Sequence, residues 1–188
     1  MKAALIGTLV MLVIGIAAGS KFVEVRKDLS AQREGVKTQW LQVDAALERR
    51  ADLIPNLVET VKETAKREMT VFKDVTDAKA ALIGGHSPQE KIQANDQLSG
   101  AIGRLLVVTE NYPELRSSED LSRLQDEIAA TENRIAIERR KYNEMLEHYN
   151  TQIQMFPDNL VAGLSGFRRN DAYFKTEPGA RSAPGAQF

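Results

Sequence analysis

Few residues in this chain are of the types that carry out chemistry. Among its 188 residues there are two histidines, His86 and His148, and no cysteine. Glu144 precedes His148 by four residues, so the two side chains would share one face of a helix, as metal ligands can. A metal site inside a helical bundle normally takes ligands from several helices, including Glu-x-x-His pairs, and this sequence has no such pair. We therefore interpret Glu144 and His148 as a solvated pair and expect no metal and no cofactor.

The sequence also lacks the motifs of common active sites. It has no G-x-x-x-x-G-K-[ST] phosphate-binding loop, and the pair Gly84-Gly85 is explained by the end of a helix. Its tyrosines have no activated partner of the kind that nucleophilic catalysis needs. A net charge of −1 and a pI near 6.2 argue against the basic stripe typical of nucleic-acid binding. These features predict a protein that is not an enzyme and does not bind nucleic acid.

Two ionisable residues, Arg50 and Glu138, interrupt apolar stripes that recur at helical spacing. The first stripe comprises Val36, Trp40, Val43 and Leu47, and the second Leu121, Leu124, Ile128, Ile135, Tyr142, Met145 and Tyr149. A charge on an apolar face is costly unless it is paired or hydrogen-bonded, so the pattern indicates a buried polar network, not necessarily joining these two residues. The alternative is that both side chains reach solvent at the rim of the bundle. A buried network would fix helix register rather than perform chemistry.

A long apolar segment opens the chain. Residues 3–20 carry no charge and are bracketed by Lys2 and Lys21. This pattern predicts a membrane-spanning anchor over residues 1–21, in contact with lipid. A cleaved signal peptide is the competing interpretation, but the run exceeds the about 7–15 residues of a usual signal core. Gly15 and Gly19 form a G-x-x-x-G pair that would permit close helix packing in the membrane, with ordinary lipid contact as the alternative.

The charges that flank the apolar segment predict its orientation. One lysine precedes the segment, whereas Lys21, Arg26, Lys27, Arg33 and Lys37 follow it closely. Positive charge tends to stay in the cytoplasm, so the pattern favours a single-pass membrane protein with its domain on the cytoplasmic side.

The rest of the chain shows helical spacing and no strand-like alternation. It breaks at IGGHSPQEK, where Ser87 and Glu90 can form a capping box, at NYPELRSSED, and at Phe156-Pro157-Asp158. Residues 175–188 are rich in proline, glycine and alanine and predict a disordered tail. The sequence therefore predicts one helical domain over residues 22–174.

Pro55 lies within a helical stretch, where it would remove a backbone hydrogen bond. We interpret it as marking a corner, at which Arg49 and Arg50 end one helix and Asp52 caps the next. The domain is then all-α, an up-and-down bundle of four comparable long helices behind the N-terminal transmembrane helix. The alternative is one long kinked helix through Pro55.

Three motifs resemble hallmarks of the LemA family, in the same order and at the same spacing. They are RRADLIPNLVETVK, ENRIAIERRKYNEMLEHYN and FPDNLVAGLSGFRRNDAYF, and the likeness covers residues 36–174. The resemblance implies a bacterial protein anchored by its N-terminus in the cytoplasmic membrane and built as four long helices. Related proteins are associated with magnetosome membranes, and family members are often encoded near membrane proteases. One departure is that DLSAQREGV stands where the family often shows a Tyr-Asn pair after its anchor.

The resemblance assigns structural or interaction roles to a set of motif residues. They are Arg49, Arg50, Asp52, Pro55 and Asn56 in the first motif, Arg139, Tyr142, Asn143, Tyr149 and Asn150 in the second, and Phe156, Pro157, Phe167 and Phe174 in the third. In the third motif, Val161, Leu164 and Phe167 could pack back on the end of the bundle. Helix termination and capping would explain these residues, and a surface for another protomer or for the bilayer interface is the alternative.

Two functions fit these features. The first is a non-enzymatic membrane scaffold that self-assembles into a homo-oligomer and organises the cell envelope. The second is an adaptor or regulator that presents a helical groove to a membrane protease or another membrane protein. Direct membrane remodelling ranks last, because acidic and basic residues are interleaved along the chain.

Overall fold

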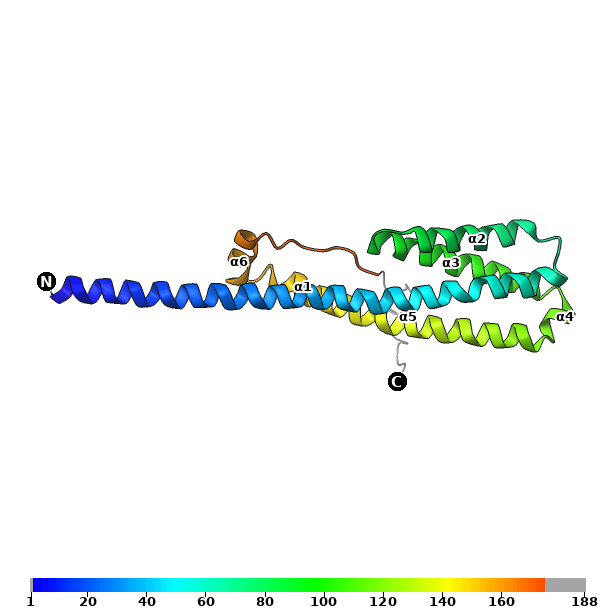
Figure 1. Ribbon diagram of the computed structural model, residues 1–188, viewed down its shortest axis with the longest axis horizontal. Coiled ribbons are helices and arrows are strands. Elements are labelled where there is room, and N and C mark those ends of the chain that lie inside the picture. The colour runs from blue at the N-terminus through cyan, green and yellow to red at the C-terminus, as the bar shows by residue number, and fades with distance from the viewer. Residues whose placement is uncertain (1, 175–188) are drawn as a thin grey trace, which may run out of the picture. The chain divides into compact units, whose positions relative to one another are not determined.

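The computed structural model describes residues 2–174, with side chains described at residues 6, 7 and 9–174. These residues form six helices and no strand, so the all-α prediction is confirmed for them (Figure 1). The helices are α1 Lys2–Thr64, α2 Met69–Gly84, α3 Pro88–Thr109, α4 Pro113–Arg116, α5 Glu119–Gln152 and α6 Asp158–Ser165. The predicted tail at 175–188 lies outside the described residues.

The predicted anchor falls on the first part of α1. Among the residues that the structure describes, no helix combines the length and the apolar character that crossing a membrane requires. The side chains of residues 2–5 and 8, which belong to the predicted anchor, lie outside the described part. At Gly15 and Gly19, an added Cβ would meet no atom within 4 Å.

The chain divides into two compact units. Unit 1 comprises residues 1–39 and 144–171, and unit 2 comprises residues 40–143 and 172–188. Helices α1 and α5 therefore contribute a segment to each unit, whereas α2, α3 and α4 belong to unit 2 and α6 to unit 1.

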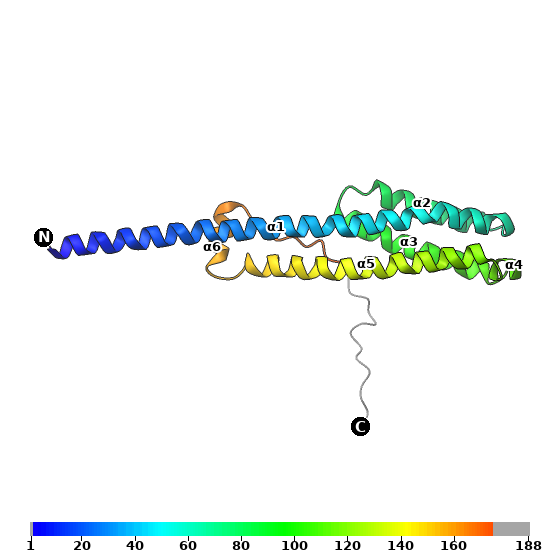
Figure 2. The same ribbon diagram turned by 60° about the horizontal axis from the view of Figure 1, so that its bottom comes forward.

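The core of unit 2 is built from the stripes that the sequence shows. Helices α2 and α3 lie side by side in both views, as do the unit 2 segments of α1 and α5 (Figures 1 and 2). The core side chains that are no more than 2% exposed include Val43, Leu47, Ile54, Leu57, Val61, Val75, Leu98, Leu105 and Ile135. Burying one such side chain contributes about 1.5–3 kcal/mol, so this stripe holds the unit together.

The predicted corner at Pro55 is wrong, because one long helix runs through this residue, as the alternative interpretation of a long kinked helix requires; its kink stays a prediction. Helix α1 passes through Pro55 and ends at Thr64. Pro55 and Asp52 are exposed, whereas Ile54 and Leu57 are buried. The proline therefore removes one hydrogen bond on the solvent side, and packing of the buried stripe keeps the helix intact despite that loss.

Other predictions tied to this corner are corrected with it. Arg49, Arg50 and Asp52 lie inside α1, so the arginines end no helix and Asp52 caps none. Four comparable helices are not observed, because the described helices contain 63, 16, 22, 4, 34 and 8 residues.

The chain reverses after α1 at residues 65–68, a stretch without glycine or proline. The Ala65 amide donates to the Val61 carbonyl at 2.9 Å, and the Glu68 amide donates to the Ala65 carbonyl at 3.1 Å. Ala65 is 0% exposed. This turn is formed by a small buried side chain and local hydrogen bonds, without glycine or proline. For this reason no residue type in the sequence indicated a turn here.

The remaining predicted breaks are confirmed. Ser87 caps α3, because its hydroxyl accepts a hydrogen bond from the Glu90 amide at 3.2 Å. The Glu90 carboxylate accepts one from the His86 amide at 2.8 Å, and this bond lowers the pKa of the carboxyl group. Ser118 caps α5 through the Leu121 amide at 3.3 Å. Helix α5 ends before Pro157, which follows Phe156 through a cis peptide bond.

Unit 1 forms around the α1 residue Leu29, which is 0% exposed. Helix α6 lies beside α1 in both views and turns its Val161 and Ala162 inward, at 8% and 2% exposed (Figures 1 and 2). It ends at Gly166, whose φ of 75° is left-handed, and the Phe167 amide bonds back to the Ala162 carbonyl at 2.9 Å. This Schellman arrangement requires a residue that tolerates positive φ, which glycine does.

We expect Pro55→Ala to stabilise the protein. The change restores a backbone donor inside α1 without removing any buried side chain, and a helix-interior proline costs up to about 3 kcal/mol relative to alanine. Denaturant unfolding followed by circular dichroism should show a higher midpoint with an unchanged spectrum. Pro88→Ala is the matched control, because proline at the first position of α3 costs nothing there and its replacement should bring no gain. A lower midpoint for Pro55→Ala would contradict this account of α1.

Candidate functional site

The polar residue predicted on the α1 stripe, Arg50, is buried in unit 2 with 2% of its surface exposed. Its Nη1 donates to Asn95 Oδ1 at 3.1 Å and to Ser99 Oγ at 2.9 Å, both on α3. Its Nη2 lies 3.5 Å from a carboxylate oxygen of Glu132 on α5. One guanidinium therefore links three helices, and the alternative that Arg50 reaches solvent at the rim is wrong.

The Arg50 guanidinium is not fully satisfied. Its Nε is buried and has no hydrogen-bond partner. Burial lowers the pKa of Arg50, the Glu132 carboxylate opposes this effect, and the positive charge of Arg139 adds to it. An arginine remains charged under such a shift. The residue therefore keeps a positive charge inside the unit, held mainly by neutral oxygens.

Glu138 is also buried, with 2% of its surface exposed. Its Oε1 lies 3.0 Å from Nε of Arg134 and 3.4 Å from Nζ of Lys141. Both cations belong to α5 and are more than half exposed. The carboxylate is therefore neutralised within its own helix by side chains that reach in from solvent, and Glu138 does not lie at the rim.

An aromatic cluster closes unit 2 near the end of its α5 segment. The Trp40 ring lies 5.4 Å from Tyr142, edge to face, and 6.0 Å from Phe174. Arg139 places its guanidinium 4.5 Å from the centre of the Phe174 ring. Burial raises the pKa of Tyr142 to about 12. The phenol therefore stays neutral at physiological pH and acts as a packing group.

Asn143 fixes the backbone of Phe174 in this cluster. Its Nδ2 donates to the Phe174 carbonyl at 2.9 Å, and its Oδ1 accepts from the Phe174 amide at 3.0 Å. The side-chain amide thus pairs with both backbone groups of one residue, as a neighbouring strand would. Phe174 is 3% exposed as a result of this docking.

Asn150 makes the same two-bond arrangement in unit 1. Its Nδ2 donates to the Asn170 carbonyl at 2.6 Å, and its Oδ1 accepts from the Asn170 amide at 2.9 Å. Asn143 and Asn150 stand seven residues apart in α5. Asn143 and Asn150 therefore play the same role: each satisfies the hydrogen-bonding groups of the backbone in the segment after α6.

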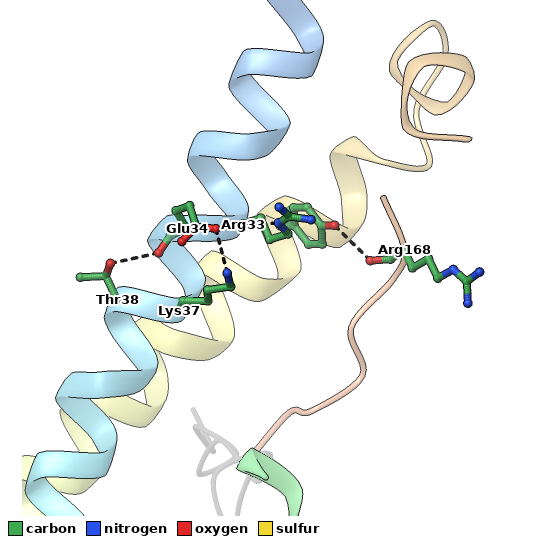
Figure 3. Close-up of polar contacts among 6 residues, drawn as sticks. Arg33, Glu34, Lys37, Thr38 and Arg168 are labelled. Atoms are coloured by element: carbon green, nitrogen blue, oxygen red, sulfur yellow. Dashed lines mark hydrogen bonds and ion pairs between the residues drawn. The ribbon is translucent and has the colours of Figure 1, made fainter. Parts of the chain in front are cut away.

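Tyr149 and Arg33 complete the attachment of that segment in unit 1. The Tyr149 hydroxyl donates to the Arg168 carbonyl at 3.0 Å, and Arg33 on α1 lies 5.3 Å from the centre of the Phe167 ring. Burial raises the pKa of Tyr149, while the charge of Arg33 opposes this shift. Figure 3 shows Arg33 on α1 beside Glu34 and Lys37, with the Arg168 side chain directed away from them. Glu34 pairs with Lys37 at 2.8 Å.

The other predicted residues lie apart from these clusters. Arg49 is 68% exposed and lies 4.0 Å from Glu127, and Asn56 lines a surface groove. Phe156 is 80% exposed and Pro157 is exposed. In the third motif, Val161 packs inward and Phe167 is half-buried. The expected packing of Leu164 is wrong, because it is 80% exposed.

Sequence reasoning missed the partners of Arg50 and the role of Trp40. Asn95 is 1% exposed and follows Ile92 by three residues, so a polar residue on an apolar stripe of α3 was an available signal. Glu132 and Ser99 carried no such signal, since both lie at the edge of the apolar faces. Glu144 and His148, the pair considered above as possible metal ligands, are both exposed. The Nδ1 atom of His148 lies 3.1 Å from Oε1 of Gln32.

The fold and the motif contacts define an all-α protein whose two buried charges, Arg50 and Glu138, are held by hydrogen bonds and ion pairs to neighbouring side chains. Among the described residues, no group of three or more histidine, cysteine, aspartate and glutamate side chains could hold a metal ion. Residues 39–188 match the LemA family, and the chain belongs to that family. The predicted resemblance is thereby confirmed.

The chain is also similar to curated magnetosome proteins. It is 27% identical over 183 residues to magnetosome protein MamQ 2, and equally to MamQ 1, both of Paramagnetospirillum magneticum. It is 24% identical over 183 residues to magnetosome protein MamQ of Magnetospirillum gryphiswaldense. Each match covers 84% of this chain and 64% of the relative, so the chain spans less than two thirds of these proteins.

We expect the Arg50–Asn95 contact to show as a coupling energy in a double-mutant cycle. Arg50→Met should lower the free energy of unfolding by about 1–3 kcal/mol, because it leaves the Asn95 side chain buried without this partner. The same change in an Asn95→Leu background should cost less, since no polar group is then stranded. Glu132→Gln, at an exposed partner, should cost under about 1 kcal/mol. Equal costs for Arg50→Met in both backgrounds would contradict the network.

We expect Asn143→Leu to release Phe174 from the aromatic cluster. The change removes both hydrogen bonds to the Phe174 backbone, and Trp40 then loses a stacked ring. Trp40 is the single tryptophan of the chain, so its fluorescence emission should shift to longer wavelength as solvent reaches it. Asn111→Leu, at an exposed asparagine, is the control and should leave the emission unchanged. An unshifted spectrum for Asn143→Leu would mean that packing alone holds Phe174.

Proposed function

We propose that this protein is a non-enzymatic scaffold, anchored in the bacterial cytoplasmic membrane by a single helix, which self-assembles and organises the cell envelope. The observation that carries the proposal is the exposure of large apolar side chains at the start of α1. Eight of them are 50–72% exposed: Ile6, Leu9, Val10, Met11, Leu12, Val13, Ile14 and Ile16. Apolar surface on this scale is unfavourable in water, so it needs lipid or protein around it.

Length and charge favour lipid around this segment. The uncharged run 3–20 would extend about 27 Å as a helix, close to the about 30 Å of a bilayer core. Basic residues follow it from Lys21 onward, which favours a domain on the cytoplasmic side. Membership of the LemA family and the similarity to magnetosome proteins support a role tied to a cell structure rather than to a reaction.

Self-assembly is the part of the proposal that explains the remaining apolar surface. Leu41 and Ile137 in unit 2 are 62% and 42% exposed. Neighbouring copies could cover such positions, and closed homo-oligomers are the commonest way in which identical chains do so. The ionisable residues at the motif positions serve packing in this view, which agrees with Arg50 and Glu138 being buried.

A second candidate is an adaptor for a membrane protease or another membrane protein. A groove of about 440 Å³ in unit 2 favours it. The groove is lined by residues from the end of α1, from α4 and from the start of α5, among them Glu59, Glu63, Glu114, Asp120 and Arg123. Four carboxylates against one guanidinium would suit a basic segment of a client.

The mass of the full chain in mild detergent, measured by light scattering with detergent correction, tests the two functions. A discrete homo-oligomer is the expected result and supports the scaffold. A monomer carrying a second protein at fixed stoichiometry would favour the adaptor, provided that Glu59→Lys with Glu63→Lys releases the second protein. A monodisperse monomer without any second protein would overturn the scaffold.

A further inference from the structure

Helix α6 carries an apolar face that its own unit does not cover. Leu160 and Leu164 lie four residues apart in α6 and are 58% and 80% exposed, and Phe156, in the turn before the helix, is 80% exposed. The neighbouring Met155 is 59% exposed. The opposite face of the helix already fills the core of unit 1 through Val161 and Ala162. The inner side chains therefore fill the core, and the outer ones remain exposed. We call the four exposed residues the α6 patch: Met155, Phe156, Leu160 and Leu164.

The α6 patch lies beside the part of α1 where the uncharged run ends. Both views place α6 against α1 within unit 1 (Figures 1 and 2). Asp158, the first residue of α6, lies close enough to Lys21 for their charges to interact. The Gln152 side chain donates to Asp158 at 2.8 Å and bonds with Gln32 of α1. These contacts hold the start of α6 next to the first charged residue after the apolar segment.

Several contacts fix the α6 patch in its outward orientation. The Schellman bonds at Gly166 end the helix, and the Tyr149 hydroxyl and Arg33 hold the segment that follows. Leu160 and Leu164 cannot turn inward without displacing Val161 and Ala162 from the core. The exposure of the patch is thus built into unit 1.

Exposed basic residues lie near this region, together with the acidic residues Glu24, Asp28 and Asp158. Arg168 follows α6 directly, is exposed, and directs its side chain away from the residues around it in Figure 3. Arg26 and Lys27, on the α1 turn after Lys21, are exposed as well. An apolar face with an aromatic residue and nearby exposed arginine and lysine side chains is compatible with a helix that lies in the headgroup region of a bilayer.

We propose that the α6 patch inserts into the interfacial region of the same bilayer that holds the start of α1, with Arg168 directed at anionic lipid headgroups. The inference rests on the anchor proposed above. The bilayer fits better than a second copy, because the patch adjoins the end of the apolar run and would share its lipid surroundings. The α6 patch would then fix the height and tilt of unit 1 above the membrane, which a single helix cannot do alone.

The chain has no cysteine, so single cysteines can carry a nitroxide label at chosen sites. The full chain would be reconstituted in phosphatidylcholine–phosphatidylglycerol vesicles with a label at Leu160→Cys, at Leu12→Cys in the anchor, or at Val107→Cys on α3. These residues have similar exposure, at 58%, 60% and 61%. Collision rates of each label with oxygen, which concentrates in lipid, and with a water-soluble nickel chelate would be measured by electron paramagnetic resonance.

We expect the oxygen-to-nickel collision ratio at position 160 to exceed that at position 107 several-fold and to lie below that at position 12. A ratio at 160 equal to that at 107, with position 12 in lipid, would overturn the α6 proposal and leave the anchor standing. Water-like ratios at both 12 and 160 would overturn the anchor itself, and this proposal with it. Dipolar broadening at 160, with low collision rates for both reagents, would show that a second copy covers the patch and would overturn lipid contact.

Discussion

The apolar stripe along α1 is the constraint on which the rest of the structure depends. This helix supplies Leu29 and Val36 to unit 1, and Val43, Leu47 and Ile54 to unit 2, all of them buried. Within unit 2 the helix continues through Pro55 to Thr64. The proline lies on the exposed side, so the burial on the other side is undisturbed and outweighs one missing hydrogen bond.

Arg50 lies on the same apolar stripe, and this position explains why its charge is buried. A guanidinium in that position loses its water and instead donates hydrogen bonds to Asn95 Oδ1 and Ser99 Oγ, with Glu132 at the surface. Such a group contributes less to stability than an apolar residue of the same size, but it tolerates only one alignment of its partners. We infer that Arg50 fixes the register of α1 against α3 and α5. A stripe of similar apolar residues can pack in more than one register, so by itself it leaves the register poorly determined.

The segment after α6 poses a different physical problem, since its extended backbone has no sheet to pair with. Asn143 and Asn150 solve it with their side-chain amides, which offer one donor and one acceptor each, as a peptide group does. Aromatic and cationic side chains add packing at Phe174 and Phe167. The motif residues Asn143 and Asn150 thus hold this backbone in place, and the apolar surfaces of α1 and α6 stay exposed.

Much of the fold followed from the sequence, because its determinants are local. Helical periodicity predicted the all-α class, and the capping residue Ser87 placed the start of α3 correctly. The burial of Arg50 and Glu138 was one of two interpretations, since spacing assigns a residue to a face but does not say how deep that face lies. Exposure of Leu164 was missed for a similar reason, because α6 has apolar residues on both faces and only packing selects one.

By itself, the sequence determined the helical class, the family motifs, the uncharged run at the N-terminus and the scarcity of catalytic residue types. Only the tertiary structure decided that α1 runs through Pro55, that the chain reverses at residues 65–68, and that asparagines clamp the closing segment. The physical reason is that a proline's effect depends on which side of the helix is buried, and that a turn without glycine or proline leaves no local mark. The partners of Arg50, Asn143 and Asn150 are distant in sequence, so contacts made on folding had to choose them.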